Sequence, residues 1–229
     1  EAIAQRSAIF SSTVGDFRPD VVVIDRHPYG IAGELRAGIH NARADGATVV
    51  LGLRDVLDEP ARVREELTGD GWRDVPELFD EVLVYGSQVL CDHEAEYGLP
   101  VAPRYCGWVV DRPPVKRREP GLLAITAGGG GDGDAVFRLG VELARSLPQR
   151  RTLLIAGPYA TRAAIGDDGD PLCNLELVRN VPSCVEVFAG ADAVVQMAGY
   201  NSTVEALAAG LRPVLVPRRS PRREQAIRA

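Results

Sequence analysis

The feature that most constrains the fold is the regular alternation of short apolar runs, rich in valine, leucine and isoleucine, with longer helical patterns. Each apolar run is continuous and reads as a strand that is buried on both faces. Strands that alternate with helices along a chain form a parallel sheet with helices packed on it. We therefore expect an α/β fold of two Rossmann-like, doubly wound domains, with ligands at the carboxyl ends of the strands.

The first half of the chain carries three clear strand runs and a last short one. These strands are expected at residues 21–24, 48–51, 81–85 and 104–110. Helical patterns occupy residues 1–17, 33–44 and 59–68. Because a doubly wound domain usually opens on a strand, we expect this amino-terminal domain to lack its first strand and the loop after it. A truncated helical pattern at residues 222–229 predicts that the chain is incomplete at both ends.

A proline-rich, charged segment without hydrophobic periodicity divides the chain and reads as an interdomain linker. The predicted organisation is a partial, acceptor-side domain over residues 1–111, a linker over 112–120, and a second domain over 121–229. Strands of the second domain are expected at residues 122–126, 152–156, 175–178, 193–195 and 213–216. A glycine loop at 127–133 and an amphipathic helix at 135–147 follow the first of them.

Composition and charge exclude several classes of protein. A chain of 229 residues with 45% hydrophobic and 25% charged residues can bury one large core or two modest ones. Its net charge of −6 gives no electrostatic basis for binding nucleic acid. No apolar run approaches the roughly 20 residues that span a bilayer, so we expect a cytoplasmic protein. The four cysteines and three histidines have no metal-ligand spacing, so we expect reduced thiols and no metal site.

A cluster of glycines follows the first strand of the second domain. Residues 128–133 read Gly-Gly-Gly-Gly-Asp-Gly, which nominally meets the pattern G-x-G-x-x-G of dinucleotide-binding loops. Glycines permit positive φ and close backbone approach, both useful where amides surround a diphosphate. A flexible surface turn is the alternative, since a run of glycines is by itself weak evidence for a binding loop.

A second strand-to-helix turn carries the more specific pattern. Residues 198–205 follow the apolar run 191–197 and open a helical pattern that ends at Gly210. The first-turn amides of such a helix lack intrahelical partners and sit at its positive end, where they suit a phosphate or diphosphate. Glu205 lies about one turn inside the helix, within reach of a ribose. A solvated helix position is the alternative for Glu205.

The order, spacing and residue types of this region resemble the nucleotide-sugar signature of the GT-B glycosyltransferases. The resemblance is strongest to the branch that holds the lipid-linked N-acetylglucosaminyltransferase of peptidoglycan synthesis and the galactolipid synthases. The matching residues are Gly199, Ser202, Thr203, Glu205, Gly210, Pro213, Pro217 and Gln225. The resemblance implies an enzyme that moves a sugar from a nucleotide diphosphate sugar to an acceptor hydroxyl, with inversion and without metal or cofactor.

The same resemblance implies roles for individual residues of the second domain. Diphosphate contacts are expected from Gly128, Gly129, Gly130, Gly199, Asn201, Ser202 and Thr203. Glu205 would bind the ribose, backbone groups of Val181 would read one face of the nucleobase, and Gln225 would touch hydroxyls of the donor sugar. A plain strand-to-helix connection is the alternative at Val181, and a surface helix is the alternative at Gln225.

Two residues of the first domain are candidates for the catalytic base. His27 follows a buried strand, and a histidine with its ordinary near-neutral pKa can accept a proton from an acceptor hydroxyl. Glu34 is a second candidate; alternatively, it starts the following helix, where its charge suits the dipole. In the families that the chain resembles, a catalytic histidine often follows the first glycine-rich loop, which we expect this chain to lack. A third interpretation is therefore that the catalytic base lies outside this chain.

The expected partners are a nucleotide diphosphate sugar and a small-molecule or lipid-linked acceptor, with peripheral membrane contact and no nucleic acid. Three further functions share parts of the pattern: a nucleotide-sugar epimerase of the same fold, a non-catalytic nucleotide-sugar binding subunit, and a Rossmann oxidoreductase. Product analysis, donor binding without turnover, and selective binding of NAD, respectively, would identify them.

Overall fold

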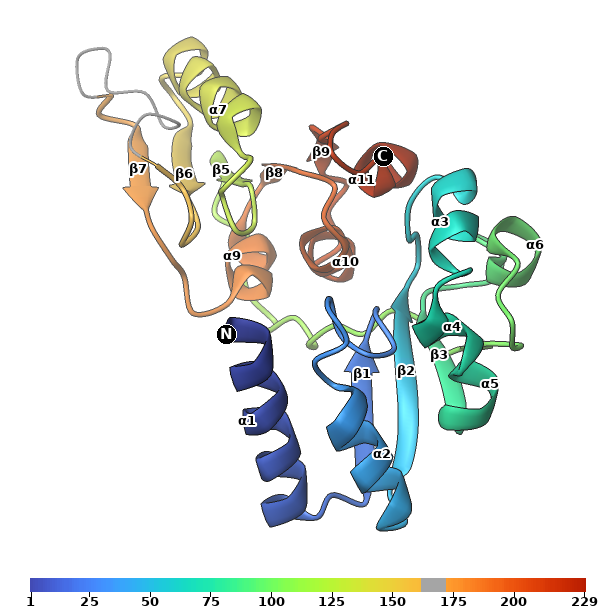
Figure 1. The fold of residues 1–229 in the computed structure, drawn as a ribbon. Helices are drawn as coiled ribbons and strands as arrows, with labels where there is room; N and C mark the ends of the chain where they lie inside the picture. Colours follow the sequence, from blue (N-terminus) through green and yellow to red (C-terminus); the bar gives the residue numbers. More distant parts are fainter. Residues whose placement is uncertain (162–171) are drawn as a thin grey trace. The chain divides into compact units, whose positions relative to one another are not determined.

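The computed structural model describes residues 1–161 and 172–229. The chain forms two compact units, residues 1–109 (unit 1) and 110–229 (unit 2). Each unit contains one parallel sheet with helices packed on it (Figure 1). The expected α/β class with two Rossmann-like sheets is therefore confirmed.

The sheet of unit 1 contains the four strands that the sequence predicted, but the last one, predicted over residues 104–110, ends after two residues. They are β1 (Val21–Asp25), β2 (Thr48–Arg54), β3 (Glu81–Tyr85) and β4 (Arg104–Tyr105). All are parallel, in the spatial order β1-β2-β3-β4. Since parallel strands share one direction, the loops after them lie at one edge of the sheet.

Six helices accompany the strands in unit 1. They are α1 (Ala2–Phe17), α2 (Arg36–Ala44), α3 (Pro60–Glu66), α4 (Asp70–Arg73), α5 (Val75–Leu78) and α6 (His93–Tyr97). Helix α2 begins three residues later than predicted, because Gly30 and Gly33 have positive φ values of 81° and 80° that a helix does not tolerate. The sequence did not predict α4, α5 or α6, since four or five residues are too few to show a helical period.

The core of unit 1 lies on one face of its sheet. Val22 and Ile24 of β1 are buried, whereas the alternate residues Val21 and Val23 are 53% and 57% exposed. Strands that follow in chain order with right-handed crossovers place all their connecting helices on the same face. The strand order of unit 1 therefore explains why only one face of β1 is covered.

Unit 2 has a five-stranded sheet with helices on both faces. Its strands are β5 (Leu122–Thr126), β6 (Arg151–Ile155), β7 (Leu175–Val178), β8 (Ala193–Gln196) and β9 (Val214–Leu215), in the order β7-β6-β5-β8-β9. Its described helices are α7 (Asp134–Ser146), α9 (Cys184–Gly190), α10 (Tyr200–Ala208) and α11 (Glu224–Arg228). All neighbouring strands are parallel. The reversal of strand order beside β5 makes this unit doubly wound.

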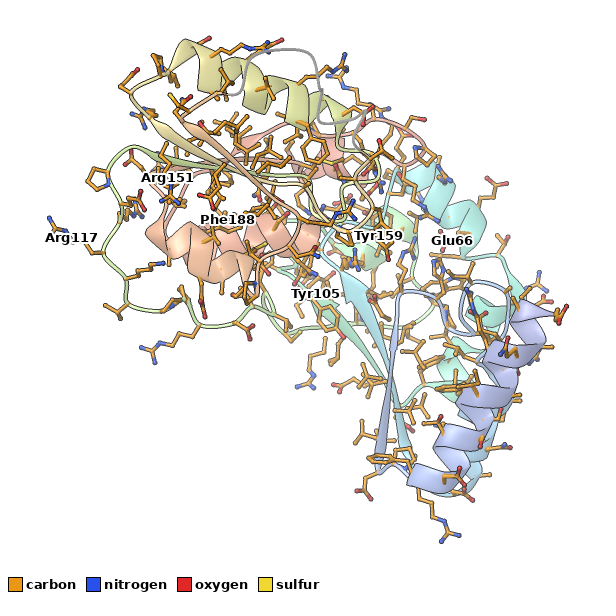
Figure 2. All side chains as sticks on the ribbon, turned by 90° about the vertical axis from the view of Figure 1, so that its left-hand side faces the viewer. Glu66, Tyr105, Arg117, Arg151, Tyr159 and Phe188 are labelled. Carbon is orange, nitrogen blue, oxygen red and sulfur yellow. The ribbon has the colours of Figure 1, made fainter. Side chains whose placement is uncertain are left out.

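Two apolar clusters lie on opposite faces of the unit 2 sheet. Ile125 of β5 packs with Phe137 of α7 in the first cluster, and Ala124 packs with Phe188 of α9 in the second. Phe188, a residue of this second cluster, is labelled in Figure 2. Because β5 is covered on both sides, all five of its residues are buried, as its continuous apolar run predicted.

The helices and the cysteines were compared with two further expectations from the sequence, on membrane spans and on disulfides. None of the helices in the described ranges is both long and apolar enough to cross a bilayer. The four cysteines are free thiols, as expected.

Candidate functional site

The strand order of unit 2 identifies its switch point. The chain leaves β5 toward β6 on one side, and β8 lies on the other side of β5. The loops that follow β5 and β8 therefore diverge at the carboxyl edge of the sheet, which is where open α/β sheets bind ligands. These two loops are the glycine cluster and the turn at Gly199, the two elements that the sequence singled out.

The glycines of the first loop have different structural roles. Gly130 is buried, has a φ of 84°, and donates its N–H to the carbonyl of Ala127 at 3.3 Å. Gly128 and Gly129 are exposed, and Gly128 donates to Oγ1 of buried Thr126 at 3.2 Å. Within the described ranges, the N–H groups of Gly129 and Gly131 have no acceptor. Gly130 therefore shapes the turn, and the amides of Gly129 and Gly131 are the ones left to bind an anion.

The loop after β6 packs directly on this glycine loop. Gly157 has a φ of 85°, and a Cβ on it would overlap the carbonyl oxygen of Gly128. The amide of Tyr159 donates to the carbonyl of Gly129 at 2.9 Å. Tyr159, labelled in Figure 2, is 75% exposed. The sequence did not predict this contact, although the Gly-Pro pair at 157–158 marked a turn.

The turn after β8 presents the start of α10. Gly199 is the N-cap, and Nε2 of fully buried Gln196 donates to the carbonyl of Ser202 at 3.1 Å. The amides of Asn201 and Ser202 find no acceptor among the described residues, as expected in a first turn. Oγ1 of buried Thr203 is likewise without a hydrogen-bond partner in the described part of the chain. The start of α10 therefore offers several donors to a ligand.

Helix α11 supports this turn from outside. Nη1 of Arg228 donates to the carbonyl of Ala198 at 2.7 Å, and its guanidinium lies 5.9 Å from the ring centroid of Tyr200. The short helix at the end of the chain therefore helps to fix the residues before and after Gly199.

The conformation of Gly199 does not require glycine. Its φ of −66° and ψ of 147° suit any residue, and a Cβ would meet only Oγ of Ser202 at 3.4 Å. We expect Gly199→Asn to leave the free energy of unfolding within about 0.5 kcal/mol of wild type, because asparagine is a good N-cap. The side chain would block approach to the turn, so affinity for a nucleoside diphosphate should fall at least about tenfold, or about 1.4 kcal/mol. Calorimetric titration measures this, and wild-type affinity would exclude a diphosphate from the turn.

Glu205 lies half-buried on α10. Its carboxylate makes no hydrogen bond or ion pair within the ranges that the structure describes. Burial, and secondly the negative charge of Asp111, raise the pKa of Glu205 above its ordinary value. Burial and the nearby Glu205 also raise the pKa of the Cys184 thiol to about 11. A partly buried carboxylate without a partner, next to a ligand edge, is typical of a functional residue.

Two other predicted donor residues also lie in loops or helices at this edge. Val181 lies between β7 and α9, and its backbone groups have no hydrogen-bond partner in the described part of the chain. Gln225 is 8% exposed, and its Oε1 accepts a hydrogen bond from the amide of Arg218 at 3.2 Å. The side-chain carbonyl of Gln225 therefore holds the loop after β9, and its amide nitrogen makes no hydrogen bond within the described ranges.

An arginine that follows β9 joins two loops of the site. Nη1 of Arg218 lies 2.6 Å from Asp132 in the glycine loop, and Nη2 lies 2.6 Å from Glu224 of α11. Since two carboxylates neutralise this guanidinium, we assign it to holding the loops together. The sequence placed Asp132 in the glycine cluster but gave no signal for its partner.

In unit 1, His27 lies directly after β1, as predicted for a residue at the carboxyl edge. Its Nδ1 lies 3.3 Å from Oε1 of Glu66, the last residue of α3. Oε2 of the same glutamate lies 2.9 Å from Nη2 of Arg26. The sequence did not single out Glu66, because it lies in another helix far along the chain.

The carboxylate of Glu34 is bound by the backbone of the loop between β1 and α2. It is 8% exposed, and its Oε2 accepts a hydrogen bond from the amide of Ala32 at 2.8 Å. Hydrogen bonds from the backbone, first of all that of Ala32, lower the pKa of Glu34. Its carboxyl lies against Gly30, where a Cβ would come within 2.7 Å. Because this carboxylate is buried and bound by the backbone, we assign Glu34 to holding the loop between β1 and α2.

The loop after β2 is held from beneath by α6. The ring nitrogens of fully buried His93 lie 2.9 Å from the carbonyl oxygen of Arg54 and 3.2 Å from that of Cys91. Burial lowers the pKa of His93, although both carbonyls favour the protonated ring. The hydroxyl of Tyr97 accepts a hydrogen bond from the amide of Leu57 at 3.2 Å. His93 therefore has a structural role in this unit.

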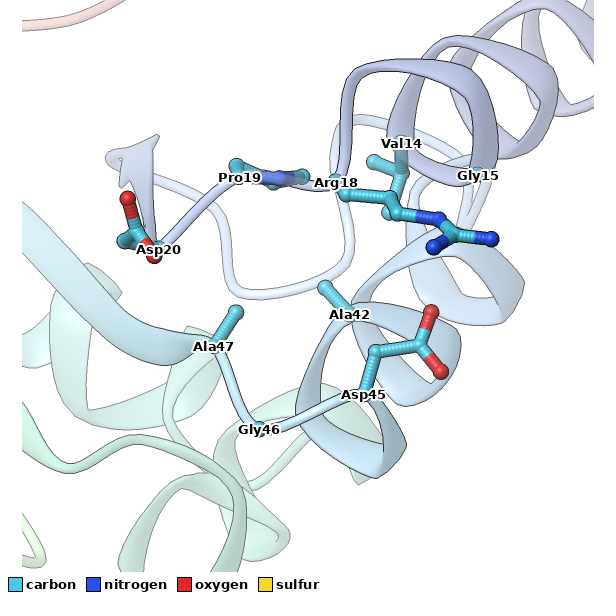
Figure 3. Close-up of a pocket in the computed structure, with 9 residues that line it drawn as sticks. All are labelled: Val14, Gly15, Arg18, Pro19, Asp20, Ala42, Asp45, Gly46 and Ala47. Carbon is cyan, nitrogen blue, oxygen red and sulfur yellow. The ribbon is translucent and has the colours of Figure 1, made fainter.

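A hollow of about 400 Å³ on unit 1 lies at the opposite edge of the sheet, where α1 and α2 end and β1 and β2 begin (Figure 3). Its lining residues are Val14, Gly15, Arg18, Pro19, Asp20, Ala42, Asp45, Gly46 and Ala47. None of them belongs to the predicted site, which lies at the carboxyl ends of the strands.

Comparison with known proteins gives matches in structure only. No protein-family model matches the sequence, and no curated protein matches it either. Solved structures similar to the chain include the glycosyltransferase SnogD from Streptomyces nogalater (TM-score 0.61, 19% identity) and MurG of Acinetobacter baumannii (0.56, 15%). They also include the UDP-N-acetylglucosamine 2-epimerase from Rickettsia bellii (0.60, 13%).

These matches extend over almost the whole chain. They cover 98%, 99% and 96% of it, and the chain spans 64%, 60% and 62% of the three structures, respectively. The chain has the GT-B fold. The resemblance in the sequence is thereby confirmed at the level of the fold. The GT-B comparison also agrees with the two parallel sheets of units 1 and 2.

Proposed function

We propose that the chain belongs to a glycosyltransferase that moves a sugar from a nucleotide diphosphate sugar to an acceptor hydroxyl. One observation carries the proposal: two sets of amides without acceptors among the described residues, in the loop after β5 and in the first turn of α10, lie at the switch point of unit 2. Two phosphate-type turns at one edge suit a diphosphate better than a single turn would.

The other donor contacts follow from the residues around these turns. In this proposal the carboxylate of Glu205 accepts hydrogen bonds from ribose hydroxyls, and backbone groups of Val181 bind the nucleobase. The amide nitrogen of Gln225 donates to a hydroxyl of the sugar. Each of these groups has hydrogen-bonding capacity that no described residue uses.

The proposed reaction is a single displacement with inversion at the anomeric carbon. A base in unit 1, for which His27 is the candidate, takes the proton of the acceptor hydroxyl while its oxygen attacks the anomeric carbon. The bond from that carbon to the diphosphate oxygen breaks, and the electron pair leaves with the nucleoside diphosphate. The amides of the two turns stabilise this developing charge, a role that a metal ion has in some enzymes.

Glu205 provides a test in which stability and binding change in opposite directions. A raised pKa means that the ionised carboxylate opposes folding at neutral pH, and that this penalty disappears as the pH falls through the raised value. We therefore expect Glu205→Gln to increase the free energy of unfolding at neutral pH. The same change should weaken nucleotide binding by about 1–3 kcal/mol, because a charged hydrogen bond to the ribose is lost.

Denaturant unfolding and calorimetric titration of this variant give the two values. Glu142→Gln is the matched control, since Glu142 is exposed on α7. For the wild-type chain, affinity should also fall as the pH drops through the raised pKa of Glu205. Unchanged nucleotide affinity in Glu205→Gln would contradict the ribose role.

The second candidate function is an epimerase that acts on a nucleotide sugar. The similarity to the UDP-N-acetylglucosamine 2-epimerase of Rickettsia bellii, with a TM-score of 0.60, favours it over a Rossmann oxidoreductase. Incubation with nucleotide sugars and candidate acceptors distinguishes the epimerase from the glycosyltransferase. A glycosyltransferase releases nucleoside diphosphate only with transfer to an acceptor, whereas an epimerase returns the nucleotide sugar with one inverted carbon. Donor binding without either product would instead identify a binding subunit.

A further inference from the structure

Hydrogen bonds join the loops after β5, β6 and β7 at the carboxyl edge of the unit 2 sheet. Arg179 is the first residue after β7, and its carbonyl accepts a hydrogen bond from the amide of Gly157 at 2.9 Å. Nη2 of Arg179 donates to the carbonyl of Ala160 at 3.4 Å. The amide of Tyr159 donates to the carbonyl of Gly129 at 2.9 Å. Arg179 and Tyr159 therefore come together next to the glycine loop.

Both side chains have hydrogen-bond donors that no described residue uses. Arg179 is exposed, and within residues 1–161 and 172–229 its guanidinium forms no ion pair with a carboxylate. Arg218, which also contacts the glycine loop, is instead neutralised by Asp132 and Glu224. Tyr159 is 75% exposed, and its hydroxyl has no hydrogen-bond partner in the described part of the chain. A cation and a phenol are thus available to a ligand at this edge.

The position of Tyr159 brings these donors next to the amides that lack acceptors. A Cβ on Gly129 would lie 3.3 Å from Cδ2 of Tyr159, and a Cβ on Gly131 would lie 3.5 Å from the Cβ of Tyr159. The side chain of Tyr159 therefore packs along the two glycines whose N–H groups are left to bind an anion. Amides carry only partial charges, whereas a guanidinium carries a full positive charge on a planar fork that matches phosphate oxygens.

We propose that Arg179 and Tyr159 bind the diphosphate of the donor together with the amides of Gly129 and Gly131. The guanidinium pairs with phosphate oxygens, and the hydroxyl of Tyr159 donates a hydrogen bond to one of them. Arg179 thereby neutralises negative charge on the departing nucleoside diphosphate, which the amides stabilise only in part. This inference rests on the proposed function, in which a nucleoside diphosphate occupies the switch point of unit 2.

Calorimetric titration of variants at Arg179 tests the role of its charge. Arg179→Gln should lower the affinity for the nucleoside diphosphate that the wild type binds best by about 10- to 100-fold, because hydrogen bonds between charged groups are lost. The affinity for the corresponding nucleoside, which has no phosphate, should not change. Arg179→Lys should restore part of the loss, since it keeps the charge without the fork. Arg138→Gln is the matched control, because exposed Arg138 of α7 also donates to a backbone carbonyl at 3.4 Å.

Nitration tests Tyr159 on the wild-type chain and does not depend on the folding of a variant. Tetranitromethane modifies exposed tyrosines, and Tyr159 is the exposed one of the six in the sequence; peptide mass spectrometry follows its rate. With the nucleoside diphosphate at about ten times its dissociation constant, the rate at Tyr159 should fall about tenfold, because only the unbound fraction reacts. Half-buried Tyr85 of unit 1 is the control and should react at an unchanged rate.

The titration of Gly199→Asn separates a failure of this inference from a failure of the proposed function. Wild-type diphosphate affinity in Arg179→Gln would exclude Arg179 from the site, and an unprotected Tyr159 would exclude Tyr159. If Gly199→Asn nevertheless weakens binding, the proposed donor site stands and only this inference is overturned. No binding of any nucleoside diphosphate by the wild-type chain would overturn both.

Discussion

Gly130→Ala is expected to lower the free energy of unfolding of unit 2 by about 3 kcal/mol or more. A side chain at the observed φ of 84° costs about 1–2 kcal/mol. A Cβ at this position would also overlap the carbonyl oxygen of Ala156, and forcing atoms into a packed site costs about 1–3 kcal/mol. The loops after β5 and β6 would have to separate, and the nucleotide site would lose its shape with them.

Gly128→Ala is the matched control for this prediction. Gly128 also has a positive φ, of 63°, but no atom lies within 4 Å of the position of a Cβ. Gly128→Ala should therefore lower the free energy of unfolding by only about 1–2 kcal/mol. Hydrogen exchange of β5 and β6 reports on unit 2, whereas both tryptophans, Trp72 and Trp108, report on unit 1 and should not respond. Equal losses in the two variants would show that the loops do not pack as described.

His27→Gln is expected to lower kcat by about 10²- to 10⁴-fold, the usual effect of removing a general base. Glutamine is similar in size and forms hydrogen bonds, but it cannot take up a proton at neutral pH. Nucleotide affinity should not change, because the donor residues belong to unit 2.

Release of nucleoside diphosphate in the presence of acceptor measures this effect. His40→Gln, at an exposed position of α2, is the control and should retain full activity. A His27→Gln variant with wild-type kcat would show that the base lies elsewhere. Combined with a normal nucleotide affinity, that result would restrict the account to the donor half of the reaction.

The strands of this chain were predictable because their signal is local. The runs at β3, β5 and β7 are rich in apolar residues and bounded by turn residues, and their predicted and observed limits coincide. Helix α7 was predicted to within one residue at each end, since its amphipathic period extends over several turns. Helix α9 has only seven residues, too few for a period, and was not predicted.

The roles of the site residues were not predictable in the same way, because they depend on contacts between distant parts of the chain. The glycine cluster predicted a backbone turn, but only the packing of Ala156 distinguishes buried Gly130 from exposed Gly128. Glu34 reads as a candidate base at a strand end, yet its side chain is buried and accepts a hydrogen bond from the amide of Ala32. Glu66 meets His27 through the packing of α3, and no pattern near either residue records that contact.

The most direct test of the central claim is calorimetric titration of this chain with UDP, GDP, dTDP and NAD, with Glu205→Ala as the control. A donor site at the switch point of unit 2 predicts selective binding of one nucleoside diphosphate, weakened in the variant by about 1–3 kcal/mol. Binding of NAD alone, or nucleoside diphosphate binding that does not respond to Glu205→Ala, would contradict the proposed donor site.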